Sequence, residues 1–250
     1  MNETLTLIPA RGGSKSIPRK NIMLINGKPM LAWTIMAALE SKLIDRVIVS
    51  TDDQEIADVA LSYGAEVPFL RPNDISGDLS TDIEFHKHAL SWLKTEEGYE
   101  PDQVVNLRPT TPYRSSEVID KAISTFSKNR DADSLRSVHM ATESPFKMWF
   151  IDESRLKPVM ENLDHNECYN QPRQLLPNVY WQDGYIDITR PRVIFDQNST
   201  TGKYIIPFLI EEQSIDIDYM DTFDLAEKQL KEKTSKTAIT EGERNLRHPS

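Results

Sequence analysis

Cysteine is nearly absent from the sequence, because Cys168 is the only one in 250 residues. A disulfide framework and a multi-cysteine metal site are therefore excluded. Long apolar runs are also missing, since none approaches the roughly 20 residues of a membrane-spanning helix. Residues 1–4 lack the basic and apolar regions of a secretion signal. These absences predict a cytoplasmic protein without a membrane partner.

Basic residues are outnumbered, with 29 Lys and Arg against 39 Asp and Glu and a formal net charge of -10. No broad basic stripe is present, which argues against nucleic acid as a partner, because nucleic-acid binding depends on many phosphate contacts. The chain is 38% hydrophobic and 27% charged. Its length and composition favour one globular domain, or one domain with a sizeable insertion.

Against this acidic background, four basic residues gather in one short loop. The apolar run 4–8 predicts a buried strand, and the loop follows it with Gly12 and Gly13. Glycine tolerates positive φ and lets consecutive N–H groups approach a ligand. Such a loop predicts a triphosphate site, although a solvated turn would have the same composition. The four basic residues are Arg11, Lys15, Arg19 and Lys20.

The first half of the chain alternates between β-branched runs and amphipathic segments. Pro29 is placed to start a helix, Asp52 to cap the next, and Thr81 with Glu84 to form a capping box. The alternation predicts an α/β fold with a mostly parallel sheet and helices on both faces, whose ligands bind at the carboxyl ends of the strands. The expected strands are 4–8, 46–51, 65–70 and 104–107, with a helix at 116–128.

The second half is less regular. Between residues 139 and 179, four prolines interrupt any periodic pattern, which is typical of a functional or partner-bound segment. Strands are expected at 184–188, 203–210 and 214–218, and a helix at 221–233. We predict an α/β domain formed by 1–138 and 180–233, an inserted segment at 139–179 and a flexible tail at 234–250.

Two carboxylates, Asp216 and Asp218, alternate with Ile215 and Ile217. On a strand, both carboxylates would point to one face and both isoleucines to the other. Mg²⁺ suits such a pair, because it binds one or two carboxylates together with phosphate oxygens. Mn²⁺ is an alternative ion, and two solvated acids at a strand end are the alternative explanation.

Several motifs occur in a fixed order along the chain. The first is P-A-R-x-x-S-K-x-[ILV]-P-x-K-N at 9–21, and the others are R-P at 71–72, L-x-P-T-[ST]-P-x-R at 107–114, Q-P-R-Q at 171–174 and I-D-x-D at 215–218. Together they resemble the sugar-acid cytidylyltransferases, the family that includes the acylneuraminate cytidylyltransferases. The resemblance implies a Rossmann-like nucleotidyltransferase fold with an inserted dimerisation arm. It also implies an enzyme that uses CTP to form a CMP-sugar acid from a nonulosonic acid and releases pyrophosphate.

The resemblance also implies roles for individual residues. Arg71 is expected to read the pairing edge of cytosine, and Lys147 and Arg173 to act on the substrate of a partner subunit in a homodimer. The expected catalytic residues are Arg11, Lys20, Asp216 and Asp218, the last two being the metal ligands. The expected CTP-binding residues are Ala10, Arg11, Gly12, Gly13, Ser14, Lys15, Lys20, Asn21, Arg71 and Thr81. The expected sugar-acid-binding residues are Arg108, Lys147, Arg173, Tyr185 and Asp187.

The sequence departs from the family at two places. Arg108 stands where the family often has Gln, which leaves open whether it meets substrate or a neighbouring acid. Tyr185 and Asp187 stand where the sialic acid enzymes tend to have a small and an aromatic residue, which predicts a different sugar pocket.

Two other functions are possible for a chain with these features. A sugar-1-phosphate nucleotidyltransferase is disfavoured because its L-x-[AG]-G-x-G-T-R opening is absent, and a non-catalytic nucleotide-binding protein because the acidic pair is intact.

Overall fold

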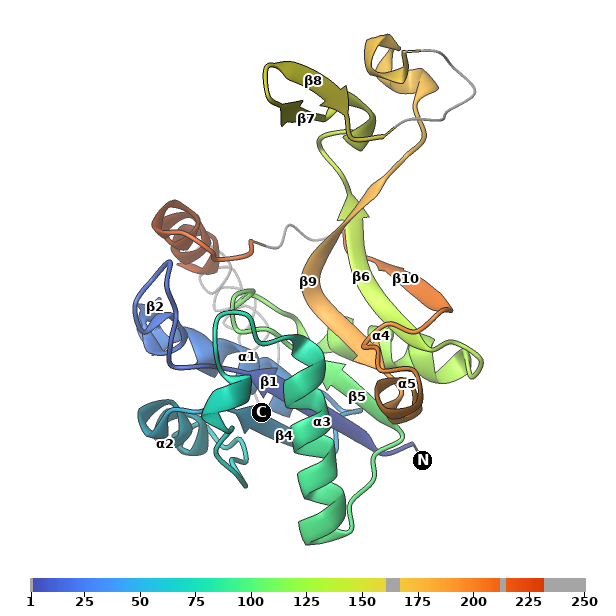
Figure 1. The fold of residues 1–250 in the computed structure, drawn as a ribbon. Helices are drawn as coiled ribbons and strands as arrows, with labels where there is room; N and C mark the ends of the chain where they lie inside the picture. The colour runs from blue at the N-terminus through green and yellow to red at the C-terminus, as the bar shows by residue number, and fades with distance from the viewer. Residues whose placement is uncertain (1, 161–166, 212–214, 232–250) are drawn as a thin grey trace, which may run out of the picture.

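A computed structural model describes residues 2–160, 167–211 and 215–231. Its centre is a six-stranded sheet in the order β10-β6-β9-β5-β1-β4 (Figure 1). β9 pairs antiparallel with β5 and β6, whereas β1 pairs parallel with β4 and β5, and β10 parallel with β6. The strands are β1 Thr4–Pro9, β4 Arg46–Ser50, β5 Gln103–Asn106, β6 Ser134–Met140, β9 Tyr180–Thr189 and β10 Ile205–Leu209. The predicted mostly parallel sheet is confirmed.

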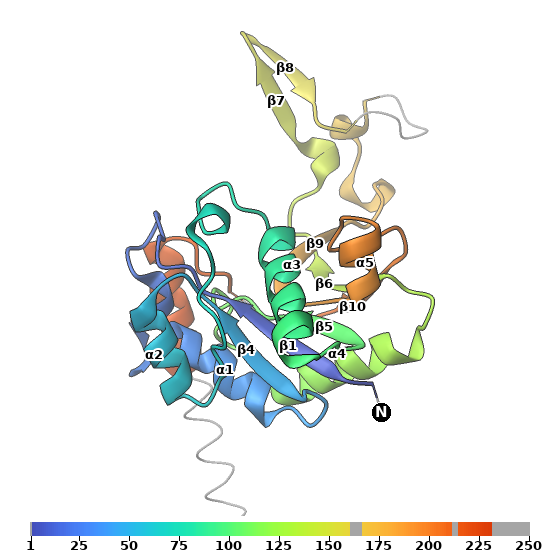
Figure 2. The same ribbon diagram turned by 60° about the horizontal axis from the view of Figure 1, so that its bottom comes forward.

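Helices cover both faces of this sheet (Figure 2). They are α1 Met30–Glu40, α2 Gln54–Ser62, α3 Asp82–Trp92, α4 Ser116–Lys128 and α5 Pro191–Asp196. Alternate residues of a strand point to opposite faces. Leu5 and Leu7 of β1 accordingly pack in the cluster that contains residues of α3 and α5, whereas Ile8 packs in the cluster that contains residues of α1, α2 and α4. Within the described residues, no helix is long and apolar enough to cross a membrane.

The predicted caps of α2 and α3 have different outcomes. Thr81 and Glu84 form the expected capping box at the start of α3. The N-cap of α2 is Asp53, whose side chain accepts a hydrogen bond from the Ile56 amide, so the prediction of Asp52 is wrong by one residue. Asp52 instead accepts a hydrogen bond of 2.9 Å from the Gly12 amide.

The strand predictions need three corrections. The segment 65–70 makes only a single bridge, Ile48 to Glu66, because the chain leaves the sheet edge there. Residues 215–217 form no strand, although the Ile217 amide donates to the Thr110 carbonyl at 2.8 Å; residue 214 lies outside the described residues. Strand β6 was not predicted, because several of its buried positions are polar, including Ser134, Arg136 and Ser137.

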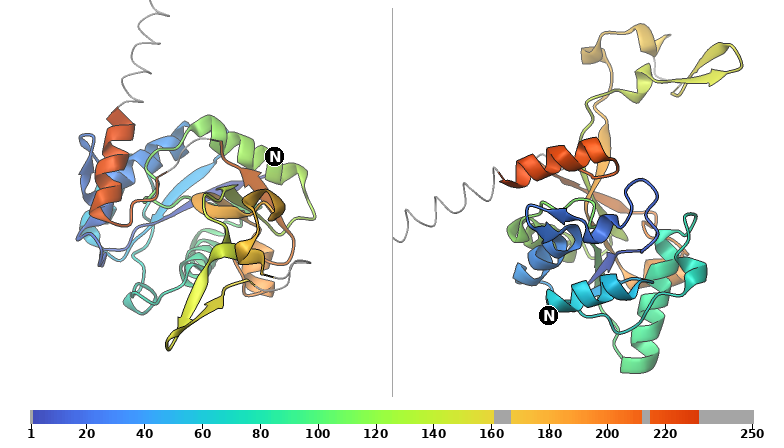
Figure 3. Two further views of the ribbon diagram at one scale, coloured as in Figure 1. Left: turned by 90° about the horizontal axis from the view of Figure 1, so that it is seen from above. Right: turned by 90° about the vertical axis from the view of Figure 1, so that its left-hand side faces the viewer.

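Residues 141–160 and 167–179 lie between β6 and β9 in the chain and stand away from the body of the molecule (Figures 1 and 3). We call them the arm. They contain the hairpin β7 Trp149–Asp152 and β8 Arg155–Pro158, and short helical turns at Pro145–Lys147, Cys168–Asn170 and Arg173–Leu175. Phe146, Cys168 and Leu176 form a small apolar cluster there, separate from the core.

Residues 220–231 are helical and lie beside the basic loop. Phe223, Ala226 and Leu230 pack with Ile17 of the loop and with Met30 at the start of α1. A small hairpin, β2 Leu24–Ile25 and β3 Lys28–Pro29, joins the loop to α1. Apolar contacts with three segments therefore hold the loop in place. The predicted tail 234–250 lies outside the described residues.

Candidate active site

A cleft of about 420 Å³ opens at the carboxyl ends of β1 and β5, where the α/β pattern places ligands. It draws its walls from the basic loop, from the segment that leads into α3 and from the turn after β5. The residues that line it are Pro9, Arg11, Ser14, Lys15, Ser16, Lys20, Asn21, Arg71, Gly77, Asp78, Ser80, Thr81, Asp82, Phe85, Arg108, Pro109, Thr110 and Asp218.

The cations of the basic loop in this cleft are paired with protein oxygens. Lys20 is buried, and its Nζ lies 2.8 Å from the Ile217 carbonyl and 3.3 Å from Asp218 Oδ1. Arg11 Nη1 lies 2.9 Å from Asp78 Oδ1, and Lys15 forms an ion pair with the other oxygen of the same carboxylate. These contacts hold the pKa of Asp78 below its usual value, with the hydrogen bond from Lys15 as the main cause.

The conformation of the basic loop differs from the prediction. Neither Gly12 nor Gly13 has a positive φ, whereas Arg19 does, at 56°. Gly12 is required for a different reason, because a Cβ there would lie 2.7 Å from Asp53 Oδ2. Arg19 forms ion pairs with Asp53 and Glu55 and is not among the residues that line the cleft. Ala10, Gly12 and Gly13 are also outside that set, although they were expected to bind CTP.

Arg71 lines the cleft and is buried at the same time. Its Nε donates to Ser50 Oγ at 3.0 Å, and its guanidinium lies 5.1 Å from the ring centre of Phe85. Burial lowers its pKa to about 10. Arg71 is therefore a buried cation in the wall of the cleft and not part of an exposed salt bridge. The part of the guanidinium that faces the cleft is oriented by Ser50 and Phe85.

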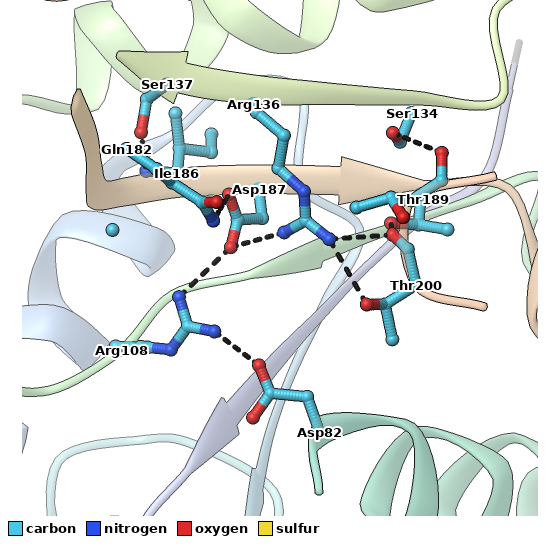
Figure 4. A network of polar contacts seen from close by, with 12 residues as sticks. Asp82, Arg108, Ser134, Arg136, Ser137, Gln182, Ile186, Asp187, Thr189 and Thr200 are labelled. Atoms are coloured by element: carbon cyan, nitrogen blue, oxygen red, sulfur yellow. Dashed lines mark hydrogen bonds and ion pairs between the residues drawn. The ribbon is translucent and has the colours of Figure 1, made fainter. Parts of the chain in front are cut away.

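Arg108 meets two neighbouring acids as well as the cleft (Figure 4). Its Nη1 lies 3.1 Å from Asp187 Oδ2, and its Nη2 contacts Asp82. Burial acts to lower the pKa of Arg108, but Asp82 and Asp187 more than offset burial, so the pKa is raised. Arg108 therefore meets neighbouring acids, one of the two possibilities that the sequence left open, and it also lies in the wall of the cleft.

Two residues expected in the sugar pocket are buried behind the cleft. Tyr185 is fully buried in the core, and its hydroxyl accepts a hydrogen bond of 2.7 Å from the Ser115 amide. Asp187 is buried between Arg108 and Arg136. Neither is among the residues that line the cleft. The expectation that they form a wall of the pocket is corrected, because β9 turns both side chains into the protein.

Lys147 and Arg173 lie on the arm and are exposed. Arg173 Nη2 donates to the Ala141 carbonyl at 3.2 Å, near the base of the arm. Neither residue belongs to the set that lines the cleft. The structure thus brings most of the expected nucleotide-binding residues together and leaves these two cations apart from them.

Asp216 and Asp218 are both exposed, and Ile217 between them is buried. The expected alternation is therefore present, but on an irregular segment instead of a strand. Asp218 lines the cleft. Among the described residues, no group of three His, Cys, Asp or Glu side chains is positioned to hold a metal ion. Two exposed carboxylates beside a basic loop fit Mg²⁺, which completes its coordination with water and phosphate oxygens.

The sequence interpretation missed several cleft residues. Most of them lie in the segment that runs from Arg71 into α3, and one lies in the turn after β5. The capping box was a signal for them, because it places the N-terminal end of α3 at the edge where the strands end. These residues are Asp78, Ser80, Asp82, Phe85 and Thr110.

Comparisons with known proteins agree with this arrangement. The profile of a family described as cytidylyltransferase matches residues 5–229. Post-translational flagellin modification protein B of Campylobacter coli is 33% identical over 236 residues, which cover 93% of this chain and 97% of the relative. CMP-N,N'-diacetyllegionaminic acid synthase of Legionella pneumophila is 35% identical over 228 residues, which cover 90% of this chain and 94% of the relative.

Two further similarities concern a longer relative and the fold. N-acylneuraminate cytidylyltransferase of Escherichia coli is 31% identical over 89% of this chain, and the match spans 51% of that longer protein. A solved structure of CMP:2-keto-3-deoxy-manno-octonic acid synthetase complexed with CTP matches with a TM-score of 0.70. It is 15% identical and covers 92% of this chain and 99% of its own. At that identity, the match shows a shared fold.

Proposed function

This chain belongs to the cytidylyltransferase family, and on that premise we propose that it forms a CMP-sugar acid from CTP and a nonulosonic acid and releases pyrophosphate. Two relatives of similar or greater length carry names for this reaction type with a legionaminic and an acylneuraminic acid. The observation that carries the proposal is the cleft itself. Arg11, Lys15 and Lys20 line it beside Asp218, in a chain whose net charge is -10.

The chemistry needs positioning and charge neutralisation. The anomeric hydroxyl of the sugar acid attacks the α-phosphate of CTP, a new P–O bond forms, and the bond to the β-phosphate breaks. Negative charge then grows on the leaving pyrophosphate, which fixed cations stabilise. Arg11, Lys15 and Lys20 are placed to bind the phosphates, and Arg71 with Thr81 to hold the base end of the nucleotide. The side-chain amide of Asn21 donates to the Arg11 carbonyl at 2.9 Å and so supports the basic loop.

Magnesium is part of the proposal. Asp216 and Asp218 would hold it next to the phosphates, in keeping with their exposure and with the position of Asp218 in the cleft. When bound, the ion would polarise the α-phosphate and acidify the attacking hydroxyl. Lys20 contacts Asp218 and is therefore next to one of the carboxylates that would hold the ion.

A homodimer and a cytoplasmic location complete the proposal. In a dimer, the arm of one subunit would reach the cleft of its partner, and Lys147 and Arg173 would then meet the carboxylate of the sugar acid. Their exposure and their separation from the cleft of their own chain support this assignment. A guanidinium is suited to binding a carboxylate with two hydrogen bonds.

The test is pyrophosphate release from CTP with N-acetylneuraminic, legionaminic, pseudaminic and 3-deoxy-octulosonic acids, in the presence and absence of Mg²⁺. We expect release with at least one acid and only with the divalent ion. Asp216→Asn and Asp218→Asn should both lower turnover, and an Asp216→Asn variant with wild-type turnover would contradict the metal assignment. Glucose 1-phosphate is the control substrate. Pyrophosphate release with glucose 1-phosphate and with none of the acids would support a sugar-1-phosphate nucleotidyltransferase. CTP binding without any pyrophosphate release would support a non-catalytic nucleotide-binding protein.

A further inference from the structure

Arg136 is a buried cation behind the cleft that the proposed reaction does not use directly. It lies on β6, and its side chain is 10% exposed. Its Nη1 lies 2.5 Å from Asp187 Oδ2, and its Nη2 donates to the Thr200 carbonyl at 2.8 Å (Figure 4). Thr189 donates to the same carbonyl at 2.6 Å. Thr200 therefore anchors the Arg136 guanidinium on the side away from Asp187, and Thr189 holds the Thr200 carbonyl in place.

Asp187 joins Arg136 to the cleft. Its side chain is 2% exposed, and its Oδ2 contacts both Arg136 and Arg108. Gln182 donates to its other oxygen at 3.4 Å. A buried carboxylate needs its partners, because removal of one leaves charge that water cannot solvate. Asp187 is thus a fixed link, and Arg108 is the one member of this pair of arginines that lines the cleft.

The charges of the network cancel. Two guanidinium groups, Arg108 and Arg136, meet two carboxylates, Asp82 and Asp187. His86 packs against the same region, and burial lowers its pKa to about 4, so it is neutral near pH 7. Arg108 therefore lines the cleft with its positive charge balanced by neighbouring carboxylates. Such a group is better suited to an uncharged acceptor than to a carboxylate, because a carboxylate would have to displace Asp82.

The position of Arg108 along the sheet edge indicates which substrate it meets. Arg71 contacts Ser50 at the end of β4, the basic loop follows β1, and Arg108 follows β5. These strands are neighbours in the order β5-β1-β4. With the base at the β4 side and the phosphates at β1, the β5 side is left for the second substrate.

We propose that Arg136 is a positioning residue that, through Asp187, holds the Arg108 guanidinium in the cleft wall as a hydrogen-bond donor to an uncharged oxygen of the sugar acid. The inference rests on the proposed function, because it concerns the second substrate of that reaction. The donor geometry is set by residues that never touch substrate.

The first test separates KM values for the two substrates. Arg136→Met should raise KM for the sugar acid about tenfold, as expected for loss of one oriented hydrogen bond, and leave KM for CTP within about twofold. Arg108→Met should do the same. The double variant should be no worse than Arg108→Met alone, because both changes remove one interaction. Arg136→Lys keeps the charge next to Asp187 and should show a smaller rise in KM for the sugar acid than Arg136→Met. It also serves as a second variant if Arg136→Met fails to fold.

Arg190→Met is the matched control. The Arg190 side chain donates to the Ala132 carbonyl at 3.0 Å and to the Asn129 carbonyl at 3.1 Å, and it stacks on Phe126; none of these three residues is labelled in the network of Figure 4. It should lower the melting temperature without a selective rise in KM for the sugar acid. Equal rises for both substrates in Arg136→Met, or additive effects in the double variant, would overturn the positioning role.

A second comparison tests the nature of the acceptor. Arg108→Gln keeps a donor without charge, whereas Arg108→Lys keeps charge with different geometry. We expect the KM for the sugar acid to be lower in Arg108→Gln than in Arg108→Lys. The opposite ranking would show that Arg108 neutralises a carboxylate and would overturn the inference while the proposed function stands. A wild-type protein that releases no pyrophosphate with any acid would contradict both.

Discussion

Asp78 stands where a phosphate group is expected. Its two oxygens contact Arg11 and Lys15, and all three residues line the cleft. A triphosphate that binds to these cations must replace the carboxylate. Asp78 therefore already neutralises part of the positive charge of the cleft, and nucleotide binding exchanges one set of ion pairs for another.

At the scale of this residue, we predict that Asp78→Asn lowers KM for CTP several-fold and makes pyrophosphate a stronger product inhibitor. The amide keeps the size of the side chain and removes the charge that competes with phosphate. Steady-state kinetics at low and high ionic strength checks this, and the effect should shrink as salt screens the cations. A rise in KM for CTP would instead show that Asp78 assists nucleotide binding.

Helix α2 and the basic loop form one unit at the scale of elements. Asp53 caps the helix and pairs with Arg19, whereas Asp52 accepts from the Gly12 amide. The hydrogen bond from Arg19 is the main cause of the lowered pKa of Asp53. Two adjacent acids therefore have different tasks, one in the helix and one in the loop.

We expect Asp53→Ala to lower the free energy of unfolding by about 1 kcal/mol, the usual effect of losing an N-cap. Asp52→Ala, the matched control, should lower it less. Because the folded-state pKa of Asp53 is lowered, its contribution is complete above the pKa of the unfolded chain and is lost as pH falls through the folded pKa. Urea unfolding at several pH values measures both effects. Equal losses for the two variants would contradict the assignment of the cap.

At the scale of the whole molecule, the arm exposes large apolar side chains. Phe150 and Ile151 of β7 are 61% and 79% exposed, and the hairpin stands away from the body (Figure 3). Exposed apolar side chains in a projecting segment are typical of an interaction surface. In the proposed homodimer, a partner subunit would cover this surface.

This leads to a complementation test. Arg11→Ala and Arg173→Ala should each abolish most of the activity as homodimers. After unfolding and refolding together in equal amounts, half of the dimers are mixed, and one of the two sites in each carries both intact residues, so about a quarter of wild-type activity should return. Recovery near zero, together with a dimer seen by analytical ultracentrifugation, would place Arg173 in the cleft of its own chain. An Arg173→Ala homodimer with wild-type activity would place Arg173 outside catalysis.

The sequence by itself determined the order of the main strands and helices of the first half, because periodicity and caps are local. It also predicted that the basic loop and Arg108 would meet at one edge of the sheet, because segments that follow parallel strands meet there, and both line the cleft. The family motifs identified Lys20 and Asp218, which are in contact there.

Only the tertiary structure decided which polar residues are buried and what they contact. Arg108 meets acids 26 and 79 positions away in the chain, and no local pattern predicts such partners. Tyr185 was expected in the sugar pocket, yet the pairing of β9 with β5 and β6 turned it into the core. Strand β6 was missed for the same reason. Arg136 is a charged residue, and its burial is tolerated because Asp187, which is distant in the sequence, pairs with it in the folded protein.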